Sequence, residues 1–421
     1  FTMGLGVTGL SRPIFWGFMI VNFVFWVGIS HAGVMISSIL RLCQAEWRRP
    51  VTRAAEVLTV CSLATAALFP MIHMGRVWRF YWVFPYDFDR MVWPDVRSPL
   101  IWDPSAIFTY LTGATLFVFM ALLPDLAILR DRTTGWQKAF YSVVSLGWRG
   151  NPRQFKLQFI LGILLSGLIL PVFVSVHSIV SFDFAVSLMP GWHATIFPPY
   201  FVAGAIYSGF AMVMTLAIPM RAAFNLDGFI TMRHIHNMTK IMLVTGMIVS
   251  YGYANEAFFS WYSGNSYEMF MMANRMAGPY AFFYWTLIAI NAVMIQLFWF
   301  RKVRDNITLL FFLSLLVNVG MWLERFVIIV LSLHRDFLRR RMMELVGFGV
   351  TAVGMVMLLA LFTYSPADPS LNHATGRTPH NIVGLPGAYV SDLLLQTFGL
   401  AIILVPVALI TAFASHVPLS V

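Results

Sequence analysis

The chain contains ten apolar stretches, each long enough to cross a lipid bilayer as a helix. A helix needs about 20 residues to cross the hydrocarbon core. Of the 421 residues, 59% are hydrophobic and only 11% are charged, which does not fit a soluble domain of this length. We therefore predict an all-α polytopic membrane protein with about ten transmembrane helices. The predicted spans are 13–40, 51–75, 105–129, 157–187, 199–222, 238–262, 279–300, 307–333, 344–364 and 391–414.

The net charge of +10 comes mainly from short loops between these spans and does not indicate nucleic-acid binding. Lys and Arg gather in the loops 41–53, 130–156 and 301–304, which the positive-inside rule places in the cytoplasm. The loop 76–104 then lies outside, and its length suggests that it covers a site or binds a partner. The basic run at 335–341 conflicts with this alternation.

The order of the spans suggests a division into parts. Residues 1–12 are expected to form a periplasmic loop, with the true N-terminus upstream, because the chain begins without Met. Residues 13–187 and 199–333 are predicted to form two four-helix bundles. Residues 339–421 add two further transmembrane helices of uncertain origin.

His73 and Asp103 form the strongest candidate site. His73 ends the second span and Asp103 precedes the third, so both are expected at the outer edge of the membrane. An imidazole and a carboxylate can together accept two protons, which suits oxidation of a quinol. The alternative is that Asp103 caps a helix that begins at Pro104.

Three further ionisable residues lie in the first predicted bundle. Asp183 is expected to face the bundle interior, because charge is costly against lipid. His177 precedes it by six residues and so faces another way. The plain interpretation of His177 is a core histidine bonded to a carbonyl. For His31, which small residues follow, packing or a hydrogen bond is favoured over metal ligation.

The second predicted bundle contains Glu324, Arg325 and Glu256. Glu324 and Arg325 could be an internal ion pair that fixes helix packing, or members of a proton path. Glu256 has the same two interpretations.

The sequence predicts no haem or iron–sulfur cluster held by this chain. Its two cysteines, Cys43 and Cys61, are too few for a cluster, which needs about four thiolates. The predicted intramembrane histidines are not spaced as the paired ligands of a diheme bundle. The chain could therefore exchange protons and bind a quinone, while the electron carriers are expected in partner proteins.

Four long segments occur in order: LSRPIFWGFMIVNFVFWVGISHAG, FPMIHMGRVWRFYW, FDFAVSLMPGWHATIFPPYFVAGAIYSGFAM and WLERFVIIVLSLHRDF. They resemble the polysulfide-reductase-like NrfD/PsrC membrane subunits over about residues 4–338, and within that family the quinol-binding ActC subunit of bacterial alternative complex III. The resemblance implies a multi-pass protein of the bacterial inner membrane that oxidises menaquinol or ubiquinol. It also implies c-type haem subunits, an iron–sulfur periplasmic subunit and a homologous membrane subunit as partners, with a terminal oxidase as a further candidate.

Matched to the family's motifs, His73 and Asp103 look like the quinol-site pair. Asp183 and Arg325 look like members of a proposed proton route. Tyr110 and Arg76 complete the expected quinol-binding set, and Glu324, Glu256 and His177 complete the expected proton path.

The C-terminal stretch resembles a different family. LFTYSPADPSLNHATG and VGLPGAYVSDLLLQTFGLAIILVP are similar to the N-terminal membrane part of FtsK-type DNA translocases. The sequence has no GxxxxGK[ST] phosphate loop, so no motor is expected here.

Three other functions stay open. The chain could be the quinone subunit of a polysulfide, nitrite or similar reductase, or a proton-coupled transporter that uses Asp183, Glu256 and Arg325. A division-site membrane anchor would account only for the last 80 or so residues. The proteins that co-purify with the chain would separate these possibilities.

Overall fold

The structure is a computed structural model that describes residues 4–10, 14–83, 97–334, 352–370, 375, 378–398, 402–403 and 405–407. Every regular element in these ranges is a helix. The chain divides into two compact units: unit 1 comprises residues 1–264 and 287–330, and unit 2 comprises residues 265–286 and 331–421. The predicted all-α polytopic membrane fold is confirmed.

Within these ranges, seven helical segments are long and apolar enough to cross a membrane, by length and composition. Several are built from more than one element, because short π-helical turns interrupt the α-helix. The first joins α1 (Phe18–Val34), η2 (Met35–Ile39) and α2 (Leu40–Leu42). The others are α3 (Arg49–His73) with its preceding turn η3 (Glu46–Arg48), α4 (Pro99–Arg132), α6 (Pro152–Ala185), α7 (Phe197–Ala223), α10 to η7 (Ala281–Trp299), and α12 with η8 (Ile307–Leu331).

An eighth long helix, α8 (Met232–Tyr262), matches the predicted span 238–262. It begins at a capping box in which Thr231 and His234 exchange hydrogen bonds. The first eight predicted spans therefore correspond to eight long helical segments, and their ends differ from the prediction by a few residues.

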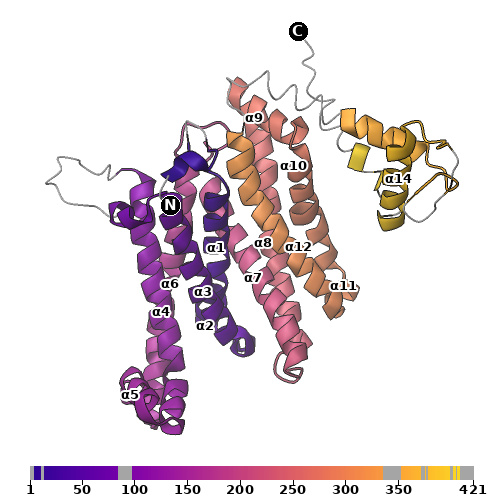
Figure 1. Ribbon diagram of the computed structural model, residues 1–421. Coiled ribbons are helices and arrows are strands. Elements are labelled where there is room, and N and C mark those ends of the chain that lie inside the picture. Colours follow the sequence, from indigo (N-terminus) through magenta and orange to yellow (C-terminus); the bar gives the residue numbers. More distant parts are fainter. Residues whose placement is uncertain are drawn as a thin grey trace. The chain divides into compact units, whose positions relative to one another are not determined.

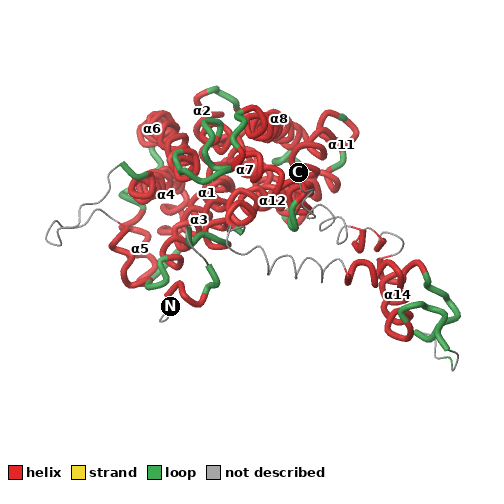
Figure 2. Tube along the Cα trace, turned by 90° about the horizontal axis from the view of Figure 1, so that it is seen from above, coloured by secondary structure: helices red, strands yellow, loops and turns green. Residues whose placement is uncertain are grey.

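The helices of unit 1 run side by side, with α1 and α7 at the centre (Figures 1 and 2). α1 packs against α3, α6, α7 and α12, and α7 also packs against α6, α8 and α12. In their most apolar windows, 72% of α1 and of α7 is buried, against 28% of α4 and of α6. α4 and α6 therefore form a peripheral pair whose outer surface is left for lipid.

Small residues allow α1 to approach its neighbours closely. A Cβ at Gly33 would collide with the carbonyl oxygen of Ala55 on α3. On the other side, a Cβ at Gly209 of α7 would lie 2.9 Å from atoms of Ala32. The expectation that the small residues after His31 permit close helix contact is confirmed.

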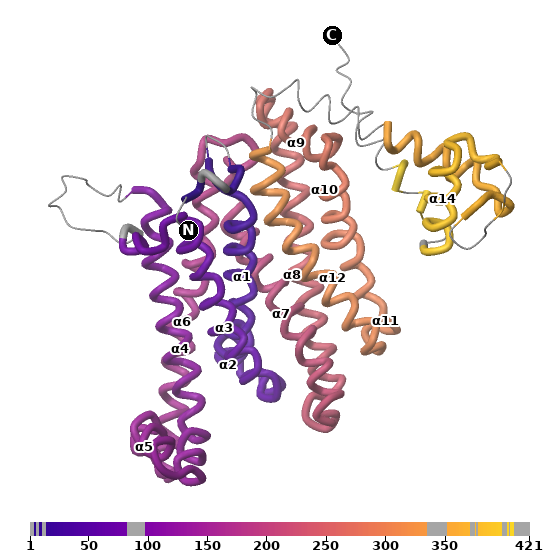
Figure 3. Tube along the Cα trace, in the orientation of Figure 1, coloured from indigo at the N-terminus to yellow at the C-terminus, as the bar shows by residue number. Residues whose placement is uncertain are grey.

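Shorter helices complete unit 1. They are η1 (Gly4–Val7), η4 (Val77–Val83), α5 (Gly135–Val144) at one end of the α4–α6 pair, and α11 (Arg301–Asp305). Figure 3 traces these elements in chain order. The division of residues 13–187 and 199–333 into two four-helix bundles stays a prediction, because unit 1 holds helices of both groups in one compact body.

Unit 2 contains α9 (Ser266–Ala277), a helix at 352–362 and α14 (Gly384–Phe398). Asp368 ties the loop between the last two by accepting backbone hydrogen bonds from His380 (2.8 Å) and Asn381 (2.9 Å). The basic run at 335–341 and most of the span 391–414 that we predicted beyond residue 398 lie outside the described residues.

Candidate functional site

A pair of buried carboxyl groups lies between α4 and α6. Asp103 is in the second turn of α4, and Asp183 is close to the end of α6. The two carboxyl groups are within hydrogen-bonding reach of each other, and Oδ1 of each is buried without a hydrogen-bond partner among the described residues. A hydrogen bond between two carboxyl groups requires a shared proton, so this acid pair can hold and release one.

The alternative interpretation of Asp103 as a helix cap is wrong. Helix α4 begins at Pro99, with Ser98 as its N-cap, so Asp103 is already inside the helix. Proline suits the first helical position because it has no N–H to leave unpaired. The side chain of Asp103 is only 7% exposed and faces the protein interior.

His73 and Arg76 lie at the same end of the bundle as Asp103. His73 is the last residue of α3, and its Nδ1 is buried and has no hydrogen-bond partner within the described ranges. Arg76 is exposed on the turn that follows. The ionisable group that interacts with Asp103 is Asp183 rather than His73. The roles of His73 and Arg76 in binding quinol stay predictions.

Tyr110 lies two turns below Asp103 on the same face of α4. Its buried hydroxyl donates a 3.0 Å hydrogen bond to the carbonyl oxygen of Ser30 on α1. Its ring centroid lies 5.3 Å from that of His31. Tyr110 therefore links the helix of the acid pair to the centre of unit 1.

His31 and His177 form a buried histidine pair, with ring centroids 4.7 Å apart in an edge-to-face arrangement. Nδ1 of His31 contacts the carbonyl oxygen of Val27 at 2.6 Å, so it must carry the proton and donate. This confirms the expected hydrogen bond. Nε2 of His31 is then left as an acceptor, and no described residue donates to it.

We expected His177 to form a hydrogen bond with a carbonyl group, but none of the described residues provides that bond. Both of its ring nitrogens are buried and have no hydrogen-bond partner in that part of the chain. The ring instead packs among aromatic groups, with the ring of Phe201 at 5.8 Å. The close approach of His31 and His177 could not be predicted, because they lie on helices far apart in the sequence.

Glu324 and Arg325 form a buried ion pair in α12, which is compatible with both interpretations, packing and proton path. Oε2 of Glu324 accepts a 2.5 Å hydrogen bond from the Tyr253 hydroxyl, and Nδ2 of Asn291 donates to that hydroxyl at 2.9 Å. The Arg325 guanidinium lies 4.5 Å from the ring centroid of Phe201. We call Glu324, Arg325, Tyr253 and Asn291 the Glu–Arg cluster.

Phe201 therefore lies between the Glu–Arg cluster and the histidine pair, since its ring contacts both Arg325 and His177. Glu256 is half-buried, three residues after Tyr253 on α8. The place of Glu256, Glu324, Arg325, His177 and Asp183 in a proton path stays a prediction.

Sequence reasoning missed Glu56, which is only 3% exposed in α3. Its carboxyl group interacts with Arg41, Arg48 and Ser37, while its Oε1 has no partner among the residues described. Glu56 lies near the beginning of α3, at the opposite end of that helix from His73. An acid inside a predicted span was itself the signal that could have identified it.

A series of hydrogen bonds, which we call the polar file, extends from Tyr110 toward Glu56 and includes main-chain groups of Ser30 and Gly33. The Ser30 carbonyl accepts from Tyr110 and also from Thr59 Oγ1 at 2.6 Å. The Gly33 N–H donates to Thr59 Oγ1 at 3.0 Å, and the Gly33 carbonyl accepts from Ser37 Oγ at 2.5 Å. Ser37 then reaches Glu56.

No group of three or more His, Cys, Asp and Glu side chains placed to hold a metal ion occurs in the part of the chain that the structure describes. The ionisable groups of the bundle are thus arranged as pairs and chains of hydrogen bonds. In an interior of low dielectric constant, hydrogen-bonded groups of this kind polarise one another.

The C-terminal part matches a different family from the rest. Residues 339–418 match the model of the 4TM region of DNA translocase FtsK/SpoIIIE. A DNA translocase FtsK of Bradyrhizobium diazoefficiens is 46% identical over 70 residues, which are 17% of this chain and 8% of that protein. The similarity therefore covers only a small membrane segment of the translocase.

The larger part resembles reductase membrane subunits. A protein of Halobacterium salinarum described as a membrane subunit of dimethyl sulfoxide reductase is 26% identical over 216 residues, or 51% of this chain and 46% of that protein. A selenate reductase subunit of Mesobacillus selenatarsenatis is 24% identical over 224 residues, or 51% of this chain and 50% of that protein. The chain thus spans about half the length of these relatives.

The family comparison covers most of the chain. Residues 6–335 match the model described as polysulphide reductase, NrfD. These residues include the acid pair, the histidine pair, the Glu–Arg cluster and Glu56. The chain therefore belongs to the NrfD polysulphide reductase family of membrane proteins.

Proposed function

We propose that this chain is the membrane subunit of a quinone-linked respiratory oxidoreductase, and that the quinone head reacts beside the acid pair. The observation that carries the proposal is the acid pair itself. Two buried carboxyl groups, each with an oxygen that no described residue contacts by a hydrogen bond, lie at the end of the bundle where α3 ends in His73. Oxidation of a quinol releases two protons and two electrons, so the protons need nearby acceptors.

The names of the relatives favour one kind of complex. They are described as subunits of dimethyl sulfoxide and selenate reductases. This supports a reductase-type membrane subunit better than the alternative complex III subunit that the sequence motifs suggest. The c-type haem subunits, an iron–sulfur subunit, a second membrane subunit and a terminal oxidase remain proposed partners, and the bacterial inner membrane is the proposed location.

In the proposed mechanism, the quinol head lies between His73 and the acid pair. One hydroxyl gives its proton to the unpartnered oxygen of Asp103 or Asp183, and the other gives its proton to the unpartnered nitrogen of His73. The two electrons pass to the acceptor of a partner protein. Tyr110, anchored to the Ser30 carbonyl, holds α4 in position beneath the head.

A second candidate function is proton translocation. The polar file favours it, because it extends from Tyr110, on the helix of the acid pair, toward Glu56 near the beginning of α3. A proton-coupled transporter would use the same groups without a quinone. Co-purification separates the two, since a respiratory subunit retains redox partners and a transporter does not.

The first prediction tests the quinone site. In the purified complex, Asp103→Asn and His73→Ala should each lower quinol turnover by about 10²- to 10⁴-fold, which is the usual contribution of a general base. The complex should remain assembled, as judged by native gel electrophoresis, because neither change introduces a new bulky group.

Asp125→Asn is the matched control. Asp125 lies on the same helix, but it is 38% exposed and pairs with Arg53 at the other end of the bundle. Its turnover should stay close to that of the wild type. Normal turnover in both the Asp103 and the His73 variants would remove the site assignment.

A further inference from the structure

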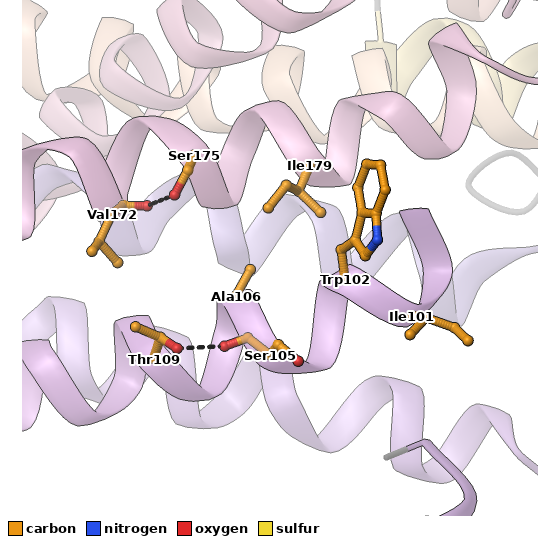
Figure 4. A pocket seen from close by; sticks show the side chains of 8 residues that line it. All are labelled: Ile101, Trp102, Ser105, Ala106, Thr109, Val172, Ser175 and Ile179. Atoms are coloured by element: carbon orange, nitrogen blue, oxygen red, sulfur yellow. Dashed lines mark hydrogen bonds between the residues drawn. The ribbon is translucent and has the colours of Figure 1, made fainter. Parts of the chain in front are cut away.

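A groove opens on the outer surface of the α4–α6 pair (Figure 4). Its cavity volume is about 370 Å³. Small-molecule pockets in proteins usually have about 300–1,000 Å³. The lining residues are Ile101, Trp102, Ser105, Ala106 and Thr109 of α4, with Val172, Ser175 and Ile179 of α6.

The groove lies directly against the acid pair. Trp102 and Ser105, which line it, are sequence neighbours of Asp103, and Ile179 precedes Asp183 by one helical turn. Trp102 is 40% exposed on the groove side, while Asp103 is 7% exposed on the inner side. The groove and the acid pair therefore lie at the same level of the α4–α6 pair, with the carboxyl groups on its inner side.

The walls of the groove suit an apolar ligand. The Thr109 hydroxyl donates to the Ser105 carbonyl at 2.7 Å, and the Ser175 hydroxyl donates to the Val172 carbonyl at 2.8 Å (Figure 4). These two hydroxyls are thus satisfied within their own helices and need no polar partner. They leave methyl and methylene groups to contact a hydrocarbon chain.

The groove is continuous with the lipid-facing surface and ends within unit 1. α4 and α6 are the least buried of the long helices around it. Farther along the pair, Gly113 of α4 meets Ile169 of α6, with its Cβ position 3.8 Å from Ile169 Cδ1. Side chains of α4 and α6 are therefore in contact again below the groove.

We propose that this groove receives the isoprenoid tail of a quinol whose head reacts at the acid pair. The inference rests on the proposed function and adds to it the element that selects for a tail. A quinol suits the groove better than a phospholipid chain. Its head carries hydroxyls for the unpartnered carboxyl oxygens, whereas an acyl chain ends in a methyl group.

Two substitutions should fill the groove. Thr109→Phe places a ring in it from an exposed position, so folding should be unaffected, and Ala106→Phe fills it from the buried wall. Leu116→Phe is the matched control, because Leu116 lies seven residues after Thr109 on the same face of α4, is 50% exposed, and does not line the groove.

The complex in proteoliposomes is assayed with long-tailed menaquinol and with tail-less menadiol. Thr109→Phe should raise the KM for menaquinol at least ten-fold and leave both KM and kcat for menadiol unchanged. Leu116→Phe should change neither. An equal effect of Thr109→Phe on both quinols, or no effect on either, would overturn the groove assignment.

A labelling experiment tests the groove without turnover. A menaquinone with a photoreactive group in its tail should label peptides covering 101–109 and 172–179 in the wild type and not in Thr109→Phe. Labelling elsewhere, or loss of only a co-purifying phospholipid in the variant, would overturn the proposal. If the wild type oxidises neither quinol but the groove is still labelled, the proposed function fails while the tail site stands.

Discussion

His177 is unusual among buried polar side chains because neither ring nitrogen has a hydrogen-bond partner in the described part of the chain. The large majority of buried side-chain polar atoms in proteins have one. The Nε2 atom of His31, one ring away, is in the same condition. The acceptor nitrogen of His31 and the donor and acceptor nitrogens of His177 together provide a place where a water molecule or a transferred proton can be held.

At the same scale, substitutions in the Glu–Arg cluster can distinguish a packing role from a role in proton transfer. Arg325→Ala should leave Glu324 as an uncompensated buried charge, which costs about 3–5 kcal/mol of folding free energy. The melting temperature and yield of the complex should fall. Arg53→Ala, at an exposed pair, should cost about 0–1 kcal/mol.

The double variant Glu324→Gln with Arg325→Met then decides the role. Because it removes both charges, it should restore the melting temperature. If turnover also returns to the wild-type level, the cluster serves packing alone and the proton-path assignment of Arg325 and Glu324 is wrong. If stability returns while turnover stays low, the proton path is supported.

Substitution of Glu56 tests whether the polar file takes part in proton movement. Glu56→Gln should reduce quinol-driven proton movement in proteoliposomes, because the amide cannot take up and release a proton. Quinol oxidation in detergent, where no gradient forms, should change much less. Glu46→Gln is the control, since Glu46 lies at the same end of α3 but is 62% exposed and pairs with Arg49. Equal proton movement in the two variants would contradict a path through Glu56.

Sequence reasoning identified which residues are ionisable and buried, but not their partners. Asp103 and Asp183 are 80 residues apart in the sequence, and only the contact of α4 with α6 brings them together. His73, which we expected to be the partner of Asp103, is instead the last residue of α3. Glu56 was missed because its neighbours Arg41 and Arg48 were interpreted only as loop charges that set the topology.

At the scale of helices, the close contact between α1 and α3 can be tested by substitution of a glycine. Gly33→Ala should destabilise unit 1 by about 1–3 kcal/mol or more, because its Cβ collides with the Ala55 carbonyl and Thr59. The melting temperature of the complex measures this. Gly167→Ala on α6, where nothing lies within 4 Å of the added Cβ, should cause no loss. Equal stability of the two variants would contradict the close approach of α1 to α3.

Helix boundaries were predictable only in part. The length of each apolar stretch was enough to identify the eight helical segments before residue 334, because it depends on composition alone. The π-helical turns at Met35–Ile39, Ala289–Val293 and Val327–Leu331 carry no such signal. One of them places the buried Asn291 beside Tyr253, so the irregular backbone contributes to the Glu–Arg cluster.

At the scale of the whole chain, the NrfD match ends at residue 335 and the FtsK-like match begins at residue 339. Almost all of unit 1 falls within the first match, and all of the ionisable groups that we assign to quinone or proton chemistry lie there. The sequence motifs predicted both parts, because each resemblance depends on contiguous residues and needs no three-dimensional information.

Helix α1 contains no acidic or basic residue other than His31, and yet it packs against α3, α6, α7 and α12. Its contribution to the polar file is made by the Ser30 carbonyl and by both backbone groups of Gly33. An alanine scan of α1 would keep these main-chain atoms and so would not report their part in the polar file. Replacement of the peptide bonds themselves, for example by esters, would test that part.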